Sequence, residues 1–290
     1  MQNTNSFQIQ PTEDGSFTFF STEFGETFHS SSGGRQEARL KFVQPLDLME
    51  KARQPSVRLL DICYGLGYNT GAALEAIWAV NPQCYVEAIA LELDPAVPKA
   101  AIAHHLTDIW HDSTIEIWQK LATNHQIQTN QLRATLLIGD ARKTIQQVCQ
   151  NFQADAIFLD PFSPPVCPQL WTVEFLGLVA KCLKPDGRIA TYSCSAAVRS
   201  ALLTARLHIG STTPVGRRSP GTVASYIPIN LHPLSPQEQE HLQTRAAVPY
   251  RDPNLADSAK VILDRRKIEQ DSSVLEPTAH WKKRWLVART

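Results

Sequence analysis

Short apolar segments recur through the middle of the chain, separated by longer segments of mixed polarity. The positions 57–60, 86–93, 135–138 and 154–159 are mostly apolar, and a fifth apolar run at 188–194 follows a Lys-Pro-Asp-Gly turn sequence. Consecutive apolar residues are typical of strands that are covered on both faces. Because such strands alternate here with helix-like segments, the pattern predicts an α/β fold with a largely parallel sheet.

Both flanks of this pattern differ from its middle. Phe7-Gln8-Ile9 and Phe17-Thr18-Phe19 stand on either side of Asp14-Gly15, which is a strong hairpin turn signal. Near the other end, the runs at 207–214 and 222–228 are close enough to pair as a terminal antiparallel hairpin. We therefore expect a β-hairpin extension before the sheet and an antiparallel pair at its end.

The segment between the second and third predicted strands, at about 95–133, is longer than one crossover helix requires. It contains two helical patterns, at 100–110 and 114–121. We expect a helical insertion at this point.

Composition narrows the class of protein. The chain has no run of about 18 apolar residues, as a membrane-spanning helix requires. Its first ten residues have neither the basic cap nor the apolar stretch of a secretory signal. The 6 cysteines are scattered without a Cys-x-x-Cys pair. We interpret the chain as a cytoplasmic protein with reduced cysteines, and we expect neither a metal centre nor a membrane contact.

The net charge of zero hides an asymmetry between the two parts of the chain. Residues 1–198 hold 14 Lys+Arg and 20 Asp+Glu, whereas residues 199–290 hold 14 Lys+Arg and 8 Asp+Glu. A basic C-terminal third is expected if that part faces a polyanion. A solvated surface with internal ion pairs explains the same counts, so charge alone leaves both interpretations open.

A glycine-containing loop follows the first predicted strand. It has the pattern Asp61-x-x-x-Gly65-x-Gly67-x-Asn69 and leads into a helix. Such glycines allow a tight turn and close approach to a ligand, although a purely structural turn would have the same pattern. A dinucleotide loop would have a third glycine at position 70, where Thr70 stands. An acidic loop of this kind suits an adenosyl ligand that carries a sulfonium and an α-amino group.

Acidic residues also follow the next two strands. Glu92 ends the second strand, where it can accept hydrogen bonds from both ribose hydroxyls, and Asp140, followed by Ala141, stands where an acid can accept the adenine amino group. Each acid could instead be a helix cap or a turn residue. Because the carboxyl ends of parallel strands form one crevice, these acids together with Asp61 predict a binding site for S-adenosylmethionine.

The fourth predicted strand ends in Asp160-Pro161-Phe162-Ser163-Pro164. Methyl transfer to an amine needs a neutral nitrogen held in line with the sulfonium. Asp160 and a neighbouring backbone carbonyl can accept the amine's hydrogen bonds, and Asp160 can take the released proton. Phe162 can stack on a flat base or cover the charged centre. A proline-rich turn that only closes the strand is the alternative.

Further motifs complete a recognisable set: Phe24-Gly25-Glu26-Thr27-Phe28-His29-Ser30, Gly33-Gly34, Glu37-Ala38 and Pro168-Gln169-Leu170-Trp171. Together with the glycine loop and the Asp160 turn, this set resembles the MnmC-type tRNA methyltransferase domain over roughly residues 7–228. The resemblance implies a class I methyltransferase with a Rossmann-like sheet and S-adenosylmethionine as the methyl donor. It also implies methylation of the aminomethyl group on carbon 5 of the wobble uridine, often 2-thiolated, in the tRNA anticodon loop.

The resemblance also implies roles for residues outside the sheet. Glu26, Phe28 and His29 are expected to form a lid over the cofactor or the target base, and Trp171 is expected to belong to the same substrate region. Arg217 and Arg218 stand where the family has a basic segment, so they are candidates for contacts with tRNA phosphates.

The chain also departs from the family pattern. Cys63 and Leu66 replace a glycine and a threonine of the usual loop, and Pro161 replaces a glycine after the Asp. Many family members are fused to a flavin-dependent oxidase domain, which nothing after residue 230 resembles, so we expect a stand-alone methyltransferase.

We expect three parts: a hairpin and lid segment at 1–44, the catalytic domain at 45–230 and a basic extension at 231–290. The oligomeric state stays open. Two alternatives also stay open: a methyltransferase for another amine, on a small molecule, protein or DNA, and a non-catalytic RNA-binding protein on the same fold.

Overall fold

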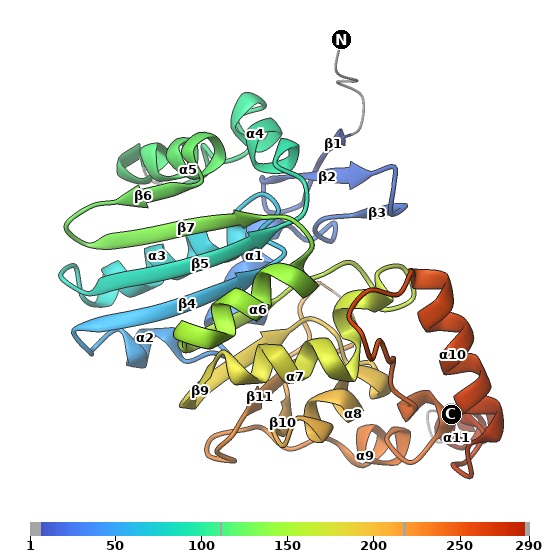
Figure 1. Ribbon diagram of the computed structural model, residues 1–290. Coiled ribbons are helices and arrows are strands. Elements are labelled where there is room, and N and C mark those ends of the chain that lie inside the picture. The colour runs from blue at the N-terminus through green and yellow to red at the C-terminus, as the bar shows by residue number, and fades with distance from the viewer. Residues whose placement is uncertain (1–6, 111, 217–218, 288–290) are drawn as a thin grey trace.

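The larger of two sheets forms the centre of the molecule (Figure 1). The computed structural model describes residues 7–110, 112–216 and 219–287. Within them, the central sheet has the strand order β10-β11-β9-β8-β4-β5-β7-β6. Its strands are β4 (Ser56–Ile62), β5 (Tyr85–Glu92), β6 (Gln126–Gln128), β7 (Leu132–Ile138), β8 (Ala154–Leu159), β9 (Leu183–Thr191), β10 (His208–Ser211) and β11 (Thr222–Ser225). The five strands from β9 to β7 in this order run parallel, which confirms the predicted α/β fold class.

The terminal hairpin is also confirmed, because β10 pairs antiparallel with β11, and β11 pairs antiparallel with β9. Two details differ from the sequence prediction. The insertion at 95–133 contains a short edge strand, β6, antiparallel to β7, besides its helices. Strand β9 begins at Leu183 rather than at 188, because a bulge opposite Ala154 and Ala156 accommodates the predicted turn inside the strand.

Helices cover both faces of this sheet (Figure 1). One face is covered by α2 (Leu48–Lys51), α3 (Tyr68–Val80), α4 (Ala96–Ala103), α5 (Asp112–Asn124) and the π-helical segment η1 (Ala38–Val43), which continues α1 (Gly34–Glu37). The other face is covered by α6 (Ala141–Asn151), α7 (Val173–Lys181) and α8 (Ala196–Thr204); the 3-10 helix η2 (Pro168–Trp171) precedes α7.

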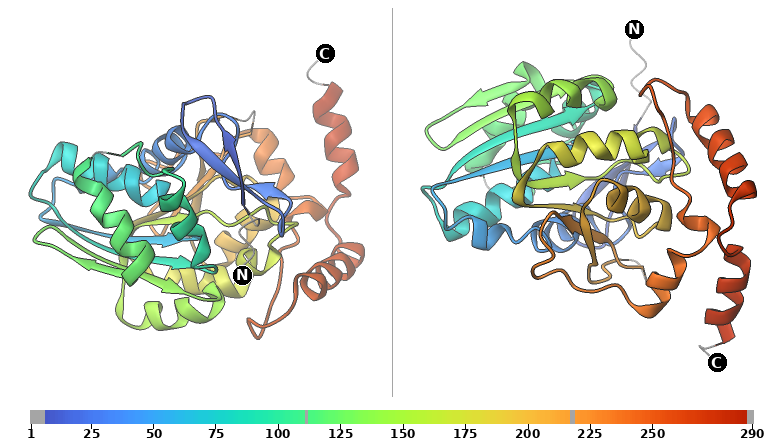
Figure 2. Two further views of the ribbon diagram at one scale, coloured as in Figure 1. Left: turned by 90° about the horizontal axis from the view of Figure 1, so that it is seen from above. Right: turned by 60° about the horizontal axis from the view of Figure 1, so that its bottom comes forward.

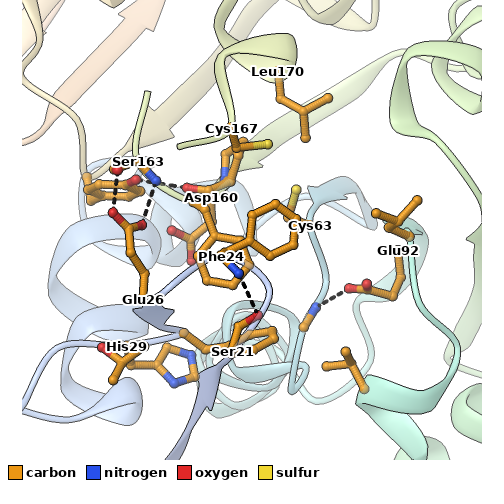
Figure 3. Close-up of a pocket in the computed structure, with 18 of the residues that line it drawn as sticks. Ser21, Phe24, Glu26, His29, Cys63, Glu92, Asp160, Ser163, Cys167 and Leu170 are labelled. Carbon is orange, nitrogen blue, oxygen red and sulfur yellow. Dashed lines mark hydrogen bonds between the residues drawn. The ribbon is translucent and has the colours of Figure 1, made fainter. Parts of the chain in front are cut away.

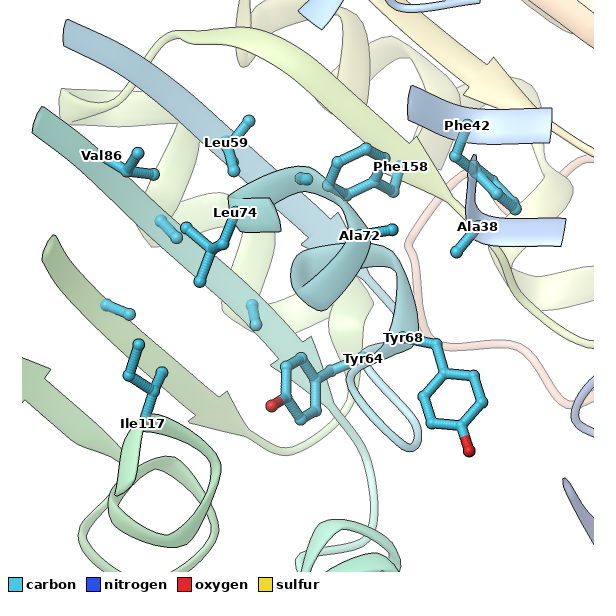
Figure 4. Close-up of a cluster of buried hydrophobic side chains, with 14 of the residues drawn as sticks. Ala38, Phe42, Leu59, Tyr64, Tyr68, Ala72, Leu74, Val86, Ile117 and Phe158 are labelled. Carbon is cyan, nitrogen blue, oxygen red and sulfur yellow. The ribbon is translucent and has the colours of Figure 1, made fainter. Parts of the chain in front are cut away.

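The two faces of the sheet build two hydrophobic cores from alternate residues of the same strands. Leu59 of β4 and Phe158 of β8 belong to the core beneath α3 (Figure 4), whereas Leu60 and Ile157 belong to the core beneath α6 and α7. Side chains of a strand point to opposite faces in turn, so consecutive apolar residues such as Leu59 and Leu60 are buried on the two faces of the sheet. This burial fixes the strands and therefore the position of the loops at their carboxyl ends.

A second, three-stranded sheet precedes the first helix. It consists of β1 (Phe7–Pro11), β2 (Phe17–Ser21) and β3 (Glu26–Thr27), paired antiparallel in that order, which confirms the predicted hairpin. The carboxylate of Asp14 in its turn accepts hydrogen bonds from the backbone N–H groups of Ser16 and Gln36. Gly33 has a φ of 112°, and a Cβ there would collide with the Asp14 carboxylate. The hairpin is thus joined closely to the start of α1.

The chain beyond β11 is largely helical and lies along one side of the molecule (Figure 2). It contains α9 (Pro236–His241), the 3-10 helix η3 (Arg245–Ala247), α10 (Ala259–Ser272) and α11 (Thr278–Val287). Several of its charged residues form ion pairs with one another or with the sheet domain, including Arg199–Glu238, Arg265–Asp257 and Arg284–Glu276. Both members of each of these pairs belong to residues 199–290, so the pairs leave the excess of basic over acidic residues in that part unchanged.

Candidate active site

A pocket of about 380 Å³ lies where the N-terminal sheet meets the carboxyl ends of β4, β5 and β8 (Figure 3). Its wall combines residues of the 24–30 segment, the glycine loop, the end of β5 and the Asp160 turn. This volume lies in the range of small-molecule sites. The position is the one at which open α/β sheets bind ligands.

The glycine loop is held against the end of β5. The backbone N–H of Gly65 donates to Glu92 Oε2 over 2.8 Å, and the N–H of Tyr64 donates to the Leu91 carbonyl over 2.9 Å. Gly67 ends the loop with a φ of 82°, and a Cβ there would collide with the Tyr64 ring. Cys63 is also in the left-handed region, with a φ of 69°. A non-glycine residue therefore occupies a backbone position that favours glycine.

The acids of this edge are largely buried. Asp61 is 1% exposed, its Oδ2 accepts from Thr70 Oγ1 over 2.6 Å, and its Oδ1 has no hydrogen-bond partner among the described residues. Burial raises the pKa of Asp61 to about 7, against the opposing effect of the Thr70 hydrogen bond. Burial also raises the pKa of Glu92, which lines the pocket. Buried carboxylates without matching cations favour a positively charged ligand.

These features fit S-adenosylmethionine. The unpartnered Asp61 oxygen and the raised pKa values of Asp61 and Glu92 mark a site that is short of positive charge and of hydrogen-bond donors. A sulfonium and an α-ammonium would supply both. Gly65 and Glu92 line the pocket, whereas Asp61, Gly67 and Asn69 are not among its lining residues.

Asp140 and Ala141 are placed differently from the other predicted cofactor residues, because neither lines the pocket. Asp140 caps α6 by accepting from the Arg142 N–H, and its two oxygens also accept from the Arg142 guanidinium at 2.7 to 3.1 Å. Arg142 in turn pairs with the fully buried Asp252 over 2.8 Å. The adenine contact of Asp140 remains a prediction, and its carboxylate already has these partners.

The turn after β8 holds Asp160 firmly. Asn69 Nδ2 donates to Asp160 Oδ2 over 2.9 Å, which links the start of α3 to the end of β8. Enclosure raises the pKa of Asp160 well above its ordinary value, although the Asn69 hydrogen bond opposes the shift. The Pro161 carbonyl accepts from Tyr192 Oη over 2.8 Å. One lone pair of the backbone carbonyl beside Asp160 is thus already engaged, and the second is left for another donor.

The prediction for Trp171 is wrong. We expected it in the substrate region, but its side chain is 0% exposed and lies in the core beneath α7. Its indole Nε1 donates to the Phe162 carbonyl over 2.8 Å. A fully buried ring cannot contact a substrate, so Trp171 instead supports the turn that carries Phe162.

Two of the predicted lid residues, Glu26 and Phe28, contact the turn that follows β8. Glu26 accepts from the Ser163 N–H over 2.9 Å and from the Ser163 hydroxyl. Phe24 stacks on Phe162 with ring centroids 4.5 Å apart, and Phe28 meets the same ring edge-on at 5.1 Å. One hydrogen-bonded carboxylate and three aromatic rings thus join the N-terminal sheet to the catalytic-edge turn.

His29 lines the pocket and stacks on Tyr68 at 4.8 Å between ring centroids. Burial lowers the pKa of His29 to about 4, so the imidazole is neutral at physiological pH. Its Nδ1 is buried and has no partner within the described part of the chain. The structure therefore brings His29 to the pocket as a neutral ring.

Two residues of the pocket wall, Glu37 and Lys41, were not predicted from the sequence to have a role in the site. They form a buried ion pair of 2.5 Å in the pocket wall. Their spacing of four residues would have been the available signal if a helix had been predicted at this position. Arg217 and Arg218 lie outside the described residues. Within residues 7–110, 112–216 and 219–287, no cluster of His, Cys, Asp or Glu is arranged to hold a metal ion, and no helix could span a membrane.

Known proteins with similar sequence or structure share this architecture. A family model described as S-adenosyl-L-methionine-dependent methyltransferase matches residues 104–227. The crystal structure of MnmC2 from Aquifex aeolicus is similar with a TM-score of 0.81 and 34% identity, over 94% of this chain and 87% of that chain. An uncharacterized protein of Methanocaldococcus jannaschii is 30% identical over 261 residues, which covers 88% of this chain and 70% of the relative.

Other relatives in sequence are longer proteins. The tRNA 5-methylaminomethyl-2-thiouridine biosynthesis bifunctional protein MnmC of Acidovorax is 29% identical over 230 residues, or 76% of this chain and 35% of the relative. The chain thus spans about a third of the length of these bifunctional relatives.

The left-handed backbone at Cys63 gives a first prediction. Cys63→Gly should have a free energy of unfolding about 1 kcal/mol higher than Cys63→Ala, because alanine keeps the strain that glycine removes. Chemical denaturation of both variants measures the difference. Cys182, with a φ of −80°, is the matched control, and there the alanine variant should be the more stable. An alanine variant at Cys63 as stable as the glycine variant would show that φ is not strained there.

Proposed function

The chain belongs to the MnmC2-type family of S-adenosyl-L-methionine-dependent methyltransferases, and we propose that it methylates the aminomethyl group on carbon 5 of the wobble uridine in the tRNA anticodon loop. The names of the bifunctional relatives refer to the biosynthesis of 5-methylaminomethyl-2-thiouridine in tRNA. The observation that carries the proposal is the position of Asp160. This carboxylate is held by Asn69 beside the glycine loop, in a pocket walled by Phe24, Phe28 and Phe162.

The cofactor side of the pocket is formed by the glycine loop and the end of β5. When bound, S-adenosylmethionine supplies an electrophilic methyl group on a sulfonium. Glu92, which lines the pocket, accepts hydrogen bonds from the ribose hydroxyls, and Gly65 lets the backbone approach the ligand. Asp61 provides negative charge from beneath the loop. Asp140 and Ala141 lie outside the pocket wall, and a contact of Asp140 with the adenine is part of the proposal.

The acceptor side of the pocket is formed by the Asp160 turn. Asp160 accepts hydrogen bonds from the amine, so that the nitrogen lone pair is directed at the methyl group. Its raised pKa makes the same carboxylate a competent acceptor for the proton that the amine loses. Pro161 fixes the backbone of the turn, and Phe162 presents its ring to a flat base.

The N-terminal sheet serves as a lid. Glu26 and Phe28 connect it to Ser163 and Phe162, so the lid and the acceptor turn form one wall. A wobble base splayed out of the anticodon loop can enter such a pocket at a modest unstacking cost. Exclusion of water by the lid strengthens the electrostatic interactions inside.

The proposal predicts which tRNA is labelled. With methyl-labelled S-adenosylmethionine, tRNA that carries a 5-aminomethyl wobble uridine should become labelled, and the same tRNA with an unmodified wobble uridine should not. Scintillation counting followed by nucleoside mass spectrometry identifies the product. Equal labelling of both tRNAs, or labelling of neither, would contradict the proposed acceptor.

The role of Asp160 predicts a second result. Asp160→Ala should lower the methylation rate at least about 100-fold, because it removes the amine's acceptor, while the affinity for S-adenosylmethionine stays within roughly tenfold. Single-turnover kinetics and calorimetry measure the two effects. Asp186→Ala, which removes an exposed acid far from the pocket wall, is the matched control. A near-normal rate in Asp160→Ala would exclude Asp160 from the chemistry.

A further inference from the structure

The buried ion pair in the pocket wall has no part in the chemistry proposed above. Lys41 lies in η1 and is only 5% exposed, and Glu37, which ends α1, is 8% exposed. Lys41 Nζ stands 2.5 Å from Glu37 Oε1. Segments of π-helix are rare and frequently occur at functional sites. Burying an ammonium is costly unless its hydrogen-bonding groups are used.

Glu37 and Lys41 differ in how many of their hydrogen-bonding groups have a partner. Glu37 also accepts from the Ser30 hydroxyl over 2.5 Å and from the Ser30 N–H over 3.2 Å. Burial raises the pKa of Glu37, but Lys41 and Ser30 lower it by more, so the carboxylate stays ionised. Lys41 has three N–H donors, and within the described residues one of them has a partner, Glu37. The remaining donors of this pocket-lining ammonium are available to a ligand.

The residues around Lys41 indicate which hydrogen-bonding groups such a ligand needs. The pocket is also lined by Asp160, so Lys41, Glu37 and the acceptor carboxylate face the same cavity of about 380 Å³. Phe24 and Phe162 supply aromatic surface for a planar ring. A ligand that reaches both Asp160 and Lys41 therefore needs a hydrogen-bond donor and, near it on the same planar group, a hydrogen-bond acceptor.

A 5-aminomethyluracil ring meets this requirement. The aminomethyl group is on carbon 5, and the adjacent carbon 4 carries a carbonyl oxygen. In cytosine, carbon 4 carries an amino group, which is a donor and cannot accept a hydrogen bond from an ammonium. The two pyrimidines therefore differ at the atom that lies next to the amine.

We propose that Lys41, held by Glu37, donates a hydrogen bond to the carbonyl oxygen on carbon 4 of the acceptor base and thereby selects uracil over cytosine. This inference rests on the proposed function. Lys41 is then a specificity-determining residue: it contacts the substrate, but it does not take part in methyl transfer. Glu37 and Ser30 position the ammonium.

The test compares two synthetic anticodon stem-loops, one with 5-aminomethyluridine and one with 5-aminomethylcytidine at the wobble position. The full chain with saturating S-adenosylmethionine should methylate the uridine stem-loop with a kcat/KM at least about tenfold above that for the cytidine stem-loop. In Lys41→Met this ratio should fall to within about threefold of one, through a loss on uridine. If Lys41 served folding alone, Lys41→Met would lower kcat/KM for both stem-loops and leave their ratio unchanged.

Two further variants keep the test decisive. Arg39→Met removes a positive charge from the same segment at an exposed position outside the pocket wall, and its ratio should equal that of the wild type. If Lys41→Met does not fold, the double variant Glu37→Gln with Lys41→Met removes both charges of the pair and should show the same loss of selectivity.

An unchanged ratio in a folded Lys41 variant would overturn the role of Lys41 and leave the proposed function intact. Methylation of neither stem-loop by the wild type would instead overturn the proposed function and this inference together.

Discussion

The site depends on an excess of buried carboxylates at the carboxyl edge of the sheet. Asp61, Glu92 and Glu37 are all less than a tenth exposed, and Asp160 is enclosed beside them, whereas Lys41 is the single buried ammonium among the pocket-lining residues. Buried charge of one sign is unfavourable unless a partner compensates it, so burial raises the pKa of Asp61, Glu92 and Asp160. A cationic methyl donor relieves this imbalance. Among these acids, Asp61, Glu92 and Asp160 accept hydrogen bonds from the neutral groups of Thr70, Gly65 and Asn69.

Rigid elements hold these groups in place. The central sheet buries both its faces and therefore fixes the strand ends, and Asn69 ties α3 to β8 across the pocket floor. The N-terminal sheet adds the wall that a plain Rossmann-like sheet lacks, through the Glu26–Ser163 contact and the stacked rings of Phe24 and Phe162. The cofactor side and the acceptor side are thus built by different parts of the chain and meet at Asp160.

The sequence predicted the parts of this arrangement that depend on local pattern. Strands buried on both faces appear as apolar runs, and an acid after such a strand lies at the sheet edge, so Glu92 and Asp160 could be placed at the pocket before the fold was known. Contacts between distant segments leave no periodic signal. For this reason Trp171 was assigned to the substrate region although it is a core residue, and the pairing of Arg142 with both Asp140 and Asp252 was not foreseen. Lys41 was missed because no helix was predicted at residues 37–41. The short edge strand β6 was also missed, because three residues are too few to show alternation.

The most direct test of this account is the affinity for S-adenosylmethionine at about pH 5.5 and about pH 7, where its α-amino group remains largely protonated. The pKa of Asp61 is raised to about 7, so this carboxyl loses its proton as the pH rises across that range. A cation binds the ionised form more tightly, and calorimetry should therefore show affinity that increases roughly tenfold from the lower to the higher pH. Asp61→Asn should show a smaller increase. Affinity that is constant, or that falls, between these pH values would contradict the account.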